Sequence, residues 1–290
     1  MKTLNFLAGI LLAASCICLT SCNEKVNSPL LTGCFSVSTS KQVRFSRGNL
    51  QYTRSTNTWS FAEHQYDFIN TSNVTGGIDY TEQGHTEYHY YKEGTGLSDK
   101  IDLFGWIGST GCAKWGISTS EDDNDYSGDF ADWGRNIGDG NTWYTLTSDE
   151  WGYLLSKRTN AGNLIGVARI KLNADGTQFA NGLVLLPDNW ACPNRVTFKS
   201  GIAADESGQA YADYQTFTLT DWRKLEVAGA VFLPAAGYRL GAGVGYAQHF
   251  GGYWSATPRA AVSFRSNLLT ISHFLGPSYG FPVRLVQDIK

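Results

Sequence analysis

Long apolar runs are missing from this 290-residue chain beyond its N-terminal segment. No later stretch reaches about 18 apolar residues, which argues against a transmembrane helix in the body of the chain. An excess of basic residues is missing too, because 23 Lys and Arg face 26 Asp and Glu, for a formal net charge of −3. The basic residues are also scattered, so the sequence gives no footprint for a polyanion and argues against nucleic acid as a partner.

Cysteine is scarce, and half of it lies in the N-terminal segment. Beyond residue 22 only Cys34, Cys112 and Cys192 remain. An odd number without CxxC spacing argues against a disulfide framework or a zinc site, although one disulfide stays open. We interpret each of the three as a small buried hydrophobic residue. The domain must then be held by its core, which a 42% hydrophobic content permits.

The N-terminus reads as an export signal. Lys2 precedes an apolar segment, residues 6–19, that is too short to span a membrane. Leu19-Thr20-Ser21-Cys22 then resembles a bacterial lipobox, in which the cysteine is lipidated. Cys16 is a weaker alternative, and an ordinary secretory signal is the other interpretation.

The predicted organisation is a signal peptide at 1–22, a polar tether at 23–33 and one domain at 34–290. Several acyl chains on Cys22 would hold the protein stably at a membrane, since one chain alone binds only weakly. We therefore expect an outer membrane lipoprotein displayed at the cell surface. The tether has a single acidic residue, Glu24, which is too little to decide its orientation.

Hydrophobic periodicity predicts an α+β domain with two main helices, short strands and long loops. Thr147 and Glu150 fit a capping box before one helix, and the second begins near Thr220 and ends at Gly229. Strands are expected within residues 35–45, 50–53, 57–69, 165–172, 182–186, 230–233 and 281–285.

The segment from Gly252 to Val286 has a framed pattern. Tyr253 and Trp254 open it, and alternating apolar residues of a predicted terminal strand, 281–285, close it. Inside, only Val262 and Phe264 follow a period of two, which predicts a short strand. The other residues follow no period, which indicates a surface loop held on a rigid scaffold, where binding functions often lie.

Seven motifs in fixed order carry a family resemblance: SRGNLQYTRSTNTWSFAEHQYDFI, IDLFGW, WYTLTSDEWGYLLSKR, LVLLPDNW, LEVAGAVFLPAAGYR, GGYWSATP and GFPVRLV. Together they span residues 35–286 and resemble Bacteroidetes lipoproteins related to the Fibrobacter succinogenes major paralogous domain. The resemblance implies a C-type-lectin-like fold of the formylglycine-generating-enzyme type. In such a fold the N- and C-terminal strands pair, and loops near the C-terminal end form the ligand surface.

Some proteins of that fold are variable proteins of diversity-generating retroelements, in which adenine-directed mutagenesis randomises chosen codons. The resemblance places a variable region at about 255–280, between WSAT and VRLV. Lys, Glu, Gln, Met and Trp do not occur in residues 255–282, which agrees with variation of AAC codons. The interior is shorter than is typical and departs from the Tyr, Ser and Asn pattern of relatives.

Candidate ligand contacts are the residues between the frame positions. They are Arg259, Ser263, Arg265, Asn267, Thr270, His273, Phe274, Ser278 and Tyr279. Arginine offers paired hydrogen bonds, and aromatic rings offer contact area at low entropy cost. Trp254 could stack on a sugar, but its place beside two glycines favours a core position.

Catalytic and metal-binding patterns are weak. His85 and His89 flank Glu87 without the spacing of a zinc helix, and residues 121–125 form an acidic run without the spacing of an EF-hand, which favours a solvated loop. We therefore predict a non-enzymatic adhesion protein without metal or cofactor, whose ligand is a protein or glycan on another cell or host surface. An enzyme or carbohydrate-processing accessory protein of the same fold, and a component of a surface appendage, are the alternatives.

Overall fold

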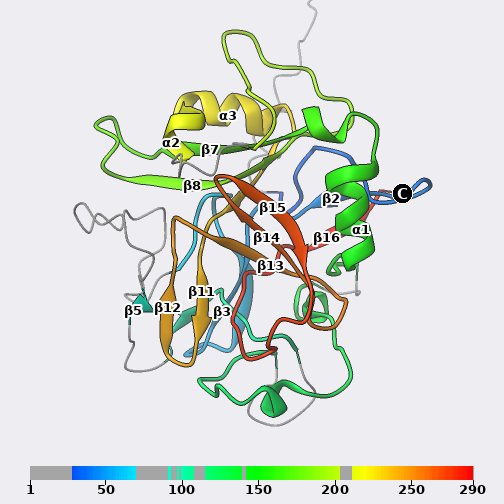
Figure 1. The fold of residues 1–290 in the computed structure, drawn as a ribbon, viewed down its shortest axis with the longest axis vertical. Coiled ribbons are helices and arrows are strands. Elements are labelled where there is room, and N and C mark those ends of the chain that lie inside the picture. The colour runs from blue at the N-terminus through cyan, green and yellow to red at the C-terminus, as the bar shows by residue number, and fades with distance from the viewer. Residues whose placement is uncertain are drawn as a thin grey trace, which may run out of the picture.

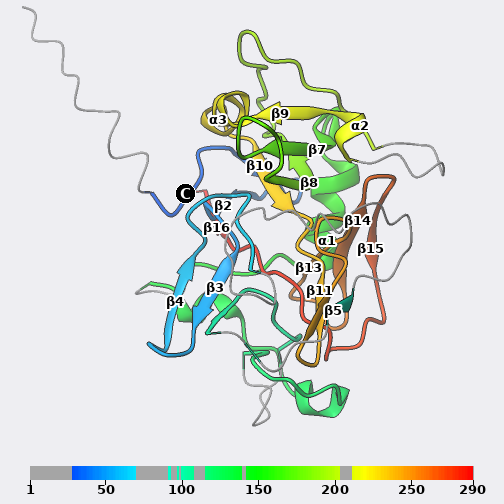
Figure 2. The same ribbon diagram turned by 90° about the vertical axis from the view of Figure 1, so that its left-hand side faces the viewer.

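The computed structural model describes residues 28–69, 91–92, 97, 99–107, 115–138, 142–202 and 211–289. The described residues combine a few short helices with many short, mostly antiparallel strands, which confirms the α+β class (Figures 1 and 2). Within this part of the chain, no helix is both long and apolar enough to cross a membrane.

The two ends of the domain pair in one sheet, as expected. Its strand order is β1 (Phe35–Ser36), β2 (Gln42–Phe45) and β16 (Val286–Asp288). In its register Val286 lies opposite Phe45. The last strand, β16, therefore pairs with β2, the second strand, and both ends of the domain lie in one sheet (Figure 1).

The terminal strand itself differs from the prediction, because residues 282–285 are not in a strand and β16 begins at Val286. Pro282 has no N–H to donate to a ladder. The side chain of Arg284 enters the core and is only 1% exposed. The carbonyls of Val283 and Leu285 instead accept single hydrogen bonds from neighbouring backbone N–H groups.

A four-stranded sheet packs against the longest helix. Its order is β10 (Val231–Pro234), β8 (Phe179–Leu185), β7 (Ile165–Lys171) and β9 (Thr216–Thr218), with β9 parallel to β7. Helix α3 (Leu219–Val227) confirms the second predicted helix and lies over this sheet (Figure 2). Trp222 and Leu225 of α3 are buried against the sheet.

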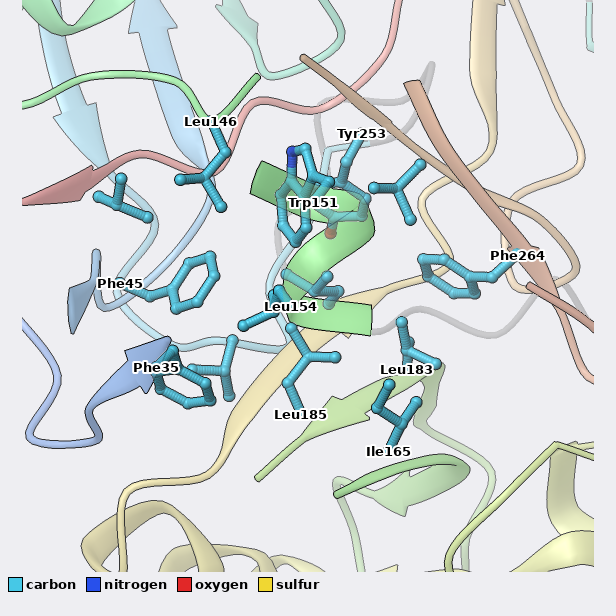
Figure 3. Close-up of a cluster of buried hydrophobic side chains, with 14 of the residues drawn as sticks. Phe35, Phe45, Leu146, Trp151, Leu154, Ile165, Leu183, Leu185, Tyr253 and Phe264 are labelled. Carbon is cyan, nitrogen blue, oxygen red and sulfur yellow. The ribbon is translucent and has the colours of Figure 1, made fainter. Parts of the chain in front are cut away.

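Helix α1 (Ser148–Gly152) begins at the predicted capping box. The Thr147 hydroxyl accepts from the Glu150 N–H at 3.2 Å, and the Glu150 carboxylate accepts from the Thr147 N–H at 2.9 Å. The chain continues in a π-helical turn, η3 (Tyr153–Lys157). Trp151 and Leu154 then lie on one face, as their spacing predicts, and point into the core (Figure 3).

Three further sheets complete the described fold. One has the order β4 (Thr58–Phe61), β3 (Leu50–Thr53) and β6 (Lys100–Ile101), and another β11 (Tyr238–Leu240), β12 (Gly243–Gly245) and β5 (Tyr91–Lys92). The third has the order β13 (Gly251–Trp254), β14 (Ala261–Arg265) and β15 (Leu268–Ser272). Short helical turns are η1 (Asp123–Tyr126), η2 (Trp133–Asn136), η4 (Ala161–Asn163) and α2 (Tyr211–Tyr214).

One core joins these elements around α1. Phe35 and Phe45 approach it from the terminal sheet, and Ile165 and Leu183 from the four-stranded sheet (Figure 3). Tyr253 and Phe264, from β13 and β14, contribute to the same cluster. The β13–β14–β15 sheet is thus fixed to the rest of the domain through its inner face.

A second core cluster contains Trp254, which is 1% exposed, together with Phe104, Trp133 and Phe281. The indole N–H of Trp254 donates to the Phe104 carbonyl at 2.7 Å. The core interpretation of Trp254 is therefore confirmed.

The glycine pair at the start of β13 is required by close approach of two rings. A Cβ on Gly251 would lie 2.0 Å from Cζ of Phe264, and one on Gly252 would lie 2.6 Å from Cδ1 of Phe281. Atoms cannot approach that closely, so any side chain here would displace a core ring. This explains why two glycines stand directly before Tyr253 and Trp254, which open the frame.

Asp102 is a buried carboxyl beside β6, with 1% exposure. It accepts a hydrogen bond from the N–H of Ile69 at 2.7 Å. Burial raises the pKa of Asp102 from 3.8 to about 7, although the bond from Ile69 acts in the other direction. Because the folded pKa is the higher one, the stability that the proton contributes is full below about pH 4 and is lost as the pH rises through about 7.

We expect Asp102→Asn to flatten this pH dependence, because asparagine keeps an acceptor for Ile69 without a titrating proton. In the wild type, loss of this contribution should lower the free energy of unfolding by roughly 2–3 kcal/mol between about pH 5 and about pH 8, since one pKa unit corresponds to about 1.4 kcal/mol. The Asp102→Asn variant should lack this decrease. Urea unfolding of both proteins at the two pH values measures the difference. Parallel pH profiles would contradict the assignment.

Candidate ligand-binding surface

The candidate residues lie on and around the β14–β15 hairpin. The predicted strand at Val262 and Phe264 is confirmed as part of β14. The prediction of an aperiodic loop was wrong for Leu268–Ser272, which form β15. Leu269 and Ile271 pack on the central core, so this strand too has an inner face.

The outer face of the hairpin carries several candidates. Ser263 lies opposite Thr270, and Arg265 lies opposite Leu268. Arg265 and Thr270 are exposed, as is Asn267 in the turn between the strands. Ser263 is only 4% exposed, so its predicted ligand contact has no support from this arrangement.

The hairpin separates the exposed candidates into two groups. Arg265 and Asn267 lie at its turn, whereas Arg259, His273 and Phe274 lie at its open end, where Ala261 pairs with Ser272. A five-residue strand spans roughly 13–17 Å. The candidates therefore form two clusters at opposite ends of the β14–β15 hairpin, and the register places Thr270 between them. Figure 1 shows the hairpin itself.

The open-end cluster, defined as Arg259, His273 and Phe274, stands on two loops that are hydrogen-bonded to each other. The Leu275 N–H donates to the Arg259 carbonyl at 3.1 Å. The preceding loop is tied to helix α1, because the Thr257 hydroxyl accepts from the Ser148 N–H at 3.0 Å.

Asp123 of η1 fixes the following loop from the other side. Its Oδ1 accepts hydrogen bonds from the Ser278 hydroxyl at 2.7 Å and the Ser278 N–H at 3.1 Å. Its Oδ2 lies 3.9 Å from the Arg259 guanidinium. The Asp123 side chain is 43% exposed, in keeping with the predicted solvated run, and it also contacts the loops that carry Arg259 and Ser278.

Two residues of the open-end cluster have unusual backbone conformations. Phe274 has φ of 63° and Arg259 has φ of 58°, both in the left-handed region. That region is unfavourable for residues with a Cβ and is found at functional sites more often than elsewhere. Phe274 is also 88% exposed, and the Arg259 side chain is 51% exposed. A strained loop therefore presents an aromatic ring directly to solvent.

Two remaining candidates have structural surroundings. Ser278 is 3% exposed and bonded to Asp123, so its predicted ligand contact is replaced by a role in fixing the loop. Tyr279 is half-buried, and its ring centroid lies 5.4 Å from that of Tyr238 and 6.2 Å from that of Phe281.

Two of the three cysteines that were predicted to be buried lie in the described residues. Cys34 is half-buried and unpaired, whereas Cys192 is exposed and unpaired, so the prediction of a buried residue was wrong for Cys192. Within the described residues, no group of three or more His, Cys, Asp or Glu side chains could hold a metal ion. Cys22, His85, His89 and Cys112 lie outside the described residues.

The sequence did not predict that the loop at 246–250 lies beside Arg265, which with Asn267 forms the turn-end cluster. The Arg265 guanidinium carbon lies 5.9 Å from the ring centroids of both Tyr246 and Phe250. A clue was present in the sequence, because three of the five residues before Gly251 are aromatic or imidazole side chains, namely Tyr246, His249 and Phe250.

Replacing Asp123 with alanine should loosen the 273–279 loop without unfolding the domain. The Ser278 N–H and hydroxyl would lose a charged acceptor, which corresponds to roughly 1–2 kcal/mol of local stability. We expect about tenfold faster amide exchange in peptides covering 273–280, measured by mass spectrometry. Asp149→Ala is a matched control on α1, and equal exchange in the two variants would contradict the role of Asp123.

Comparison with known proteins gives no match to a family model, to a curated protein or to a solved structure.

Proposed function

We propose that this chain is a non-enzymatic ligand-binding protein whose contacts come from the β14–β15 hairpin and its flanking loops. The observation that carries the proposal is Phe274, an 88% exposed ring in a left-handed conformation on a loop fixed by Asp123 and Arg259. Exposure and backbone strain both disfavour phenylalanine at this position. A partner that covers the ring would recover about 2–3 kcal/mol.

An exposed apolar side chain is not by itself evidence of a binding site, as Val227 shows. It is 82% exposed, but it is the last residue of helix α3, where single exposed apolar residues are ordinary. Phe274 differs because its loop is pre-organised by hydrogen bonds, and pre-organised aromatic residues are typical binding hot spots. Arg259 and His273 beside it supply polar contacts at the rim.

The proposed setting follows from the sequence motifs. Lipidation of Cys22 would hold the protein at the outer membrane, with the domain at the cell surface and its ligand a protein or glycan on another cell or host. The family resemblance supports a C-type-lectin-like fold for the domain. Pairing of β2 with β16 is in keeping with that fold.

Diversification of the hairpin region is part of the proposal. Six of the nine candidate positions are exposed: Arg259, Arg265, Asn267, Thr270, His273 and Phe274. Substitutions at exposed positions usually change stability little, so variation there would leave the core intact. Diversification would be supported by a near-identical DNA repeat beside the gene that differs at adenines, together with a reverse transcriptase gene. A gene with neither of these nearby would contradict it.

A binding screen tests the function. The mature chain with Cys22→Ser, which stays unlipidated, is applied to arrays of purified extracellular proteins and of glycans. Each ligand found is then tested against a variant with Arg259, His273 and Phe274 all changed to serine. We expect the variant to lose binding while it keeps the thermal stability of the parent. Undiminished binding by the folded variant would place the site elsewhere.

A further inference from the structure

The loop at 246–250 is held in a strained conformation beside the hairpin turn. Tyr246 has φ of 60° and Gln248 has φ of 67°, both in the left-handed region. Strain of this kind persists only where the surroundings fix it. The loop therefore needs an internal support.

Gln248 is that support. It is 2% exposed, and its side-chain amide accepts from the Asn181 N–H at 2.7 Å and donates to the Phe179 carbonyl at 2.7 Å. Its backbone N–H donates to the Ala235 carbonyl at 2.6 Å. The loop is thereby attached to β8 and the end of β10, so Tyr246 and Phe250 are presented by a rigid base.

Arg265 points from the end of β14 toward this loop. It is exposed, and its guanidinium carbon lies 5.9 Å from the ring centroids of Tyr246 and Phe250. Among the residues that the structure describes, no carboxylate lies within ion-pair distance of Arg265. An exposed guanidinium beside aromatic rings can bind a planar anion through two parallel hydrogen bonds.

The electrostatic surroundings are positive as well. His249 lies in the same loop and keeps exposed surface. Partial burial, Arg169 and Arg265 all lower the pKa of His249 below its usual 6.5, so its imidazole is neutral at pH 7 and the positive charge beside it is that of the two guanidinium groups. Arg169 is itself held in place by the ring of Phe179, 3.7 Å from its guanidinium carbon.

We propose that Arg265, His249 and the rings of Tyr246 and Phe250 form a subsite for the carboxylate or sulfate of an acidic sugar. The proposal rests on the proposed binding function, because it uses the other end of the same hairpin. A sugar ring matches the half-buried aromatic rings, and its single anionic group matches the one exposed guanidinium between them. A polyanionic peptide would need a longer row of cations.

Calorimetric titration of the mature Cys22→Ser protein tests the subsite with sialyllactose, its methyl ester, a monosaccharide glucuronate and a singly sulfated galactoside. We expect at least one acidic sugar to bind, with about tenfold weaker binding for the neutral ester and for Arg265→Gln. Binding should also weaken as salt rises from about 50 to about 300 mM. Arg223→Gln removes the same charge from the exposed face of α3 and should change nothing.

Failure of the whole acidic panel, equal binding of the ester, or an unchanged affinity in Arg265→Gln would each overturn the subsite. Stronger binding of a hexaglutamate peptide than of any acidic sugar would overturn it too. Phe274→Ser is expected to leave sugar binding unchanged. If the sugars fail while Phe274→Ser still removes another ligand, only the subsite is wrong and the proposed function stands.

Discussion

Replacing Arg284 with methionine should lower the free energy of unfolding by about 3–5 kcal/mol. Arg284 is 1% exposed, and burial lowers its pKa only to about 10, so it remains charged at neutral pH. Its guanidinium donates to the Phe232 carbonyl at 2.8 Å, to Gln65 Oε1 at 3.1 Å and to Asn49 Oδ1 at 3.2 Å. Methionine fills similar space but leaves these three acceptors without their donor.

The expected loss in the free energy of unfolding is large because several distant segments of the chain are joined by hydrogen bonds at Arg284. Gln65 also accepts from the Phe232 N–H at 2.8 Å, and Asn49 donates to the Tyr253 hydroxyl at 3.2 Å. The network thus connects the segment after β2, the four-stranded sheet, β13 and the C-terminal segment. Loss of one member leaves hydrogen-bonding groups of the others without that partner in the core, where an unpaired polar group is costly.

Urea unfolding followed by tryptophan fluorescence measures the Arg284 effect. Arg223→Met makes the same substitution on the exposed face of α3 and should change the free energy of unfolding by less than about 0.5 kcal/mol. A loss below about 1 kcal/mol for Arg284→Met would show that the network contributes little.

Phe274→Ser should weaken binding of the main ligand by roughly 30-fold to 1,000-fold, which corresponds to about 2–4 kcal/mol. The ring is 88% exposed in the free protein, so its removal costs the fold almost nothing. In the complex it would be the most deeply buried side chain of the loop. Titration by calorimetry or surface plasmon resonance gives the ratio of dissociation constants.

Val227→Ser is the matched control for Phe274→Ser. It removes a side chain with 82% exposure from the end of α3, without touching the hairpin. Its affinity should equal that of the wild type, and both variants should keep the wild-type melting temperature. If the two substitutions weaken binding equally, general surface hydrophobicity and not the Phe274 loop explains the affinity.

Features with a local physical cause could be predicted from the sequence. The capping box at Thr147 and Glu150 is a contact between residues three apart, and the helix begins there. The alternation of Val262 and Phe264 likewise marked β14. The glycine pair before Tyr253 and Trp254 was visible in the sequence, but the rings that require it belong to later residues of the same segment, Phe264 and Phe281.

The missed features depend on contacts between distant segments. Arg284 looked like the polar face of a terminal strand, but its partners at Asn49 and Gln65 lie more than 200 positions away. Asp123 looked like part of a solvated run, and its attachment to Ser278 spans 155 positions. No local pattern encodes such pairs.

The hairpin itself was predicted only in part. Its second strand was missed although Leu269 and Ile271 alternate with Thr270, because adjacent Leu268 obscured the period. As a result the binding region was interpreted as one loop, whereas the structure divides it into two ends of a rigid hairpin. That division separates the proposed ligand contact at Phe274 from the proposed subsite at Arg265.

The most direct test of the ligand surface is hydrogen exchange of the mature protein with and without its main ligand. The account predicts slower exchange on binding in peptides covering residues 256–260 and 272–277, which carry Arg259, His273 and Phe274. Peptides of α3 and of the β7–β8 hairpin should exchange equally in both states. Protection confined to those elements, with no change around Phe274, would contradict the assignment of the binding surface.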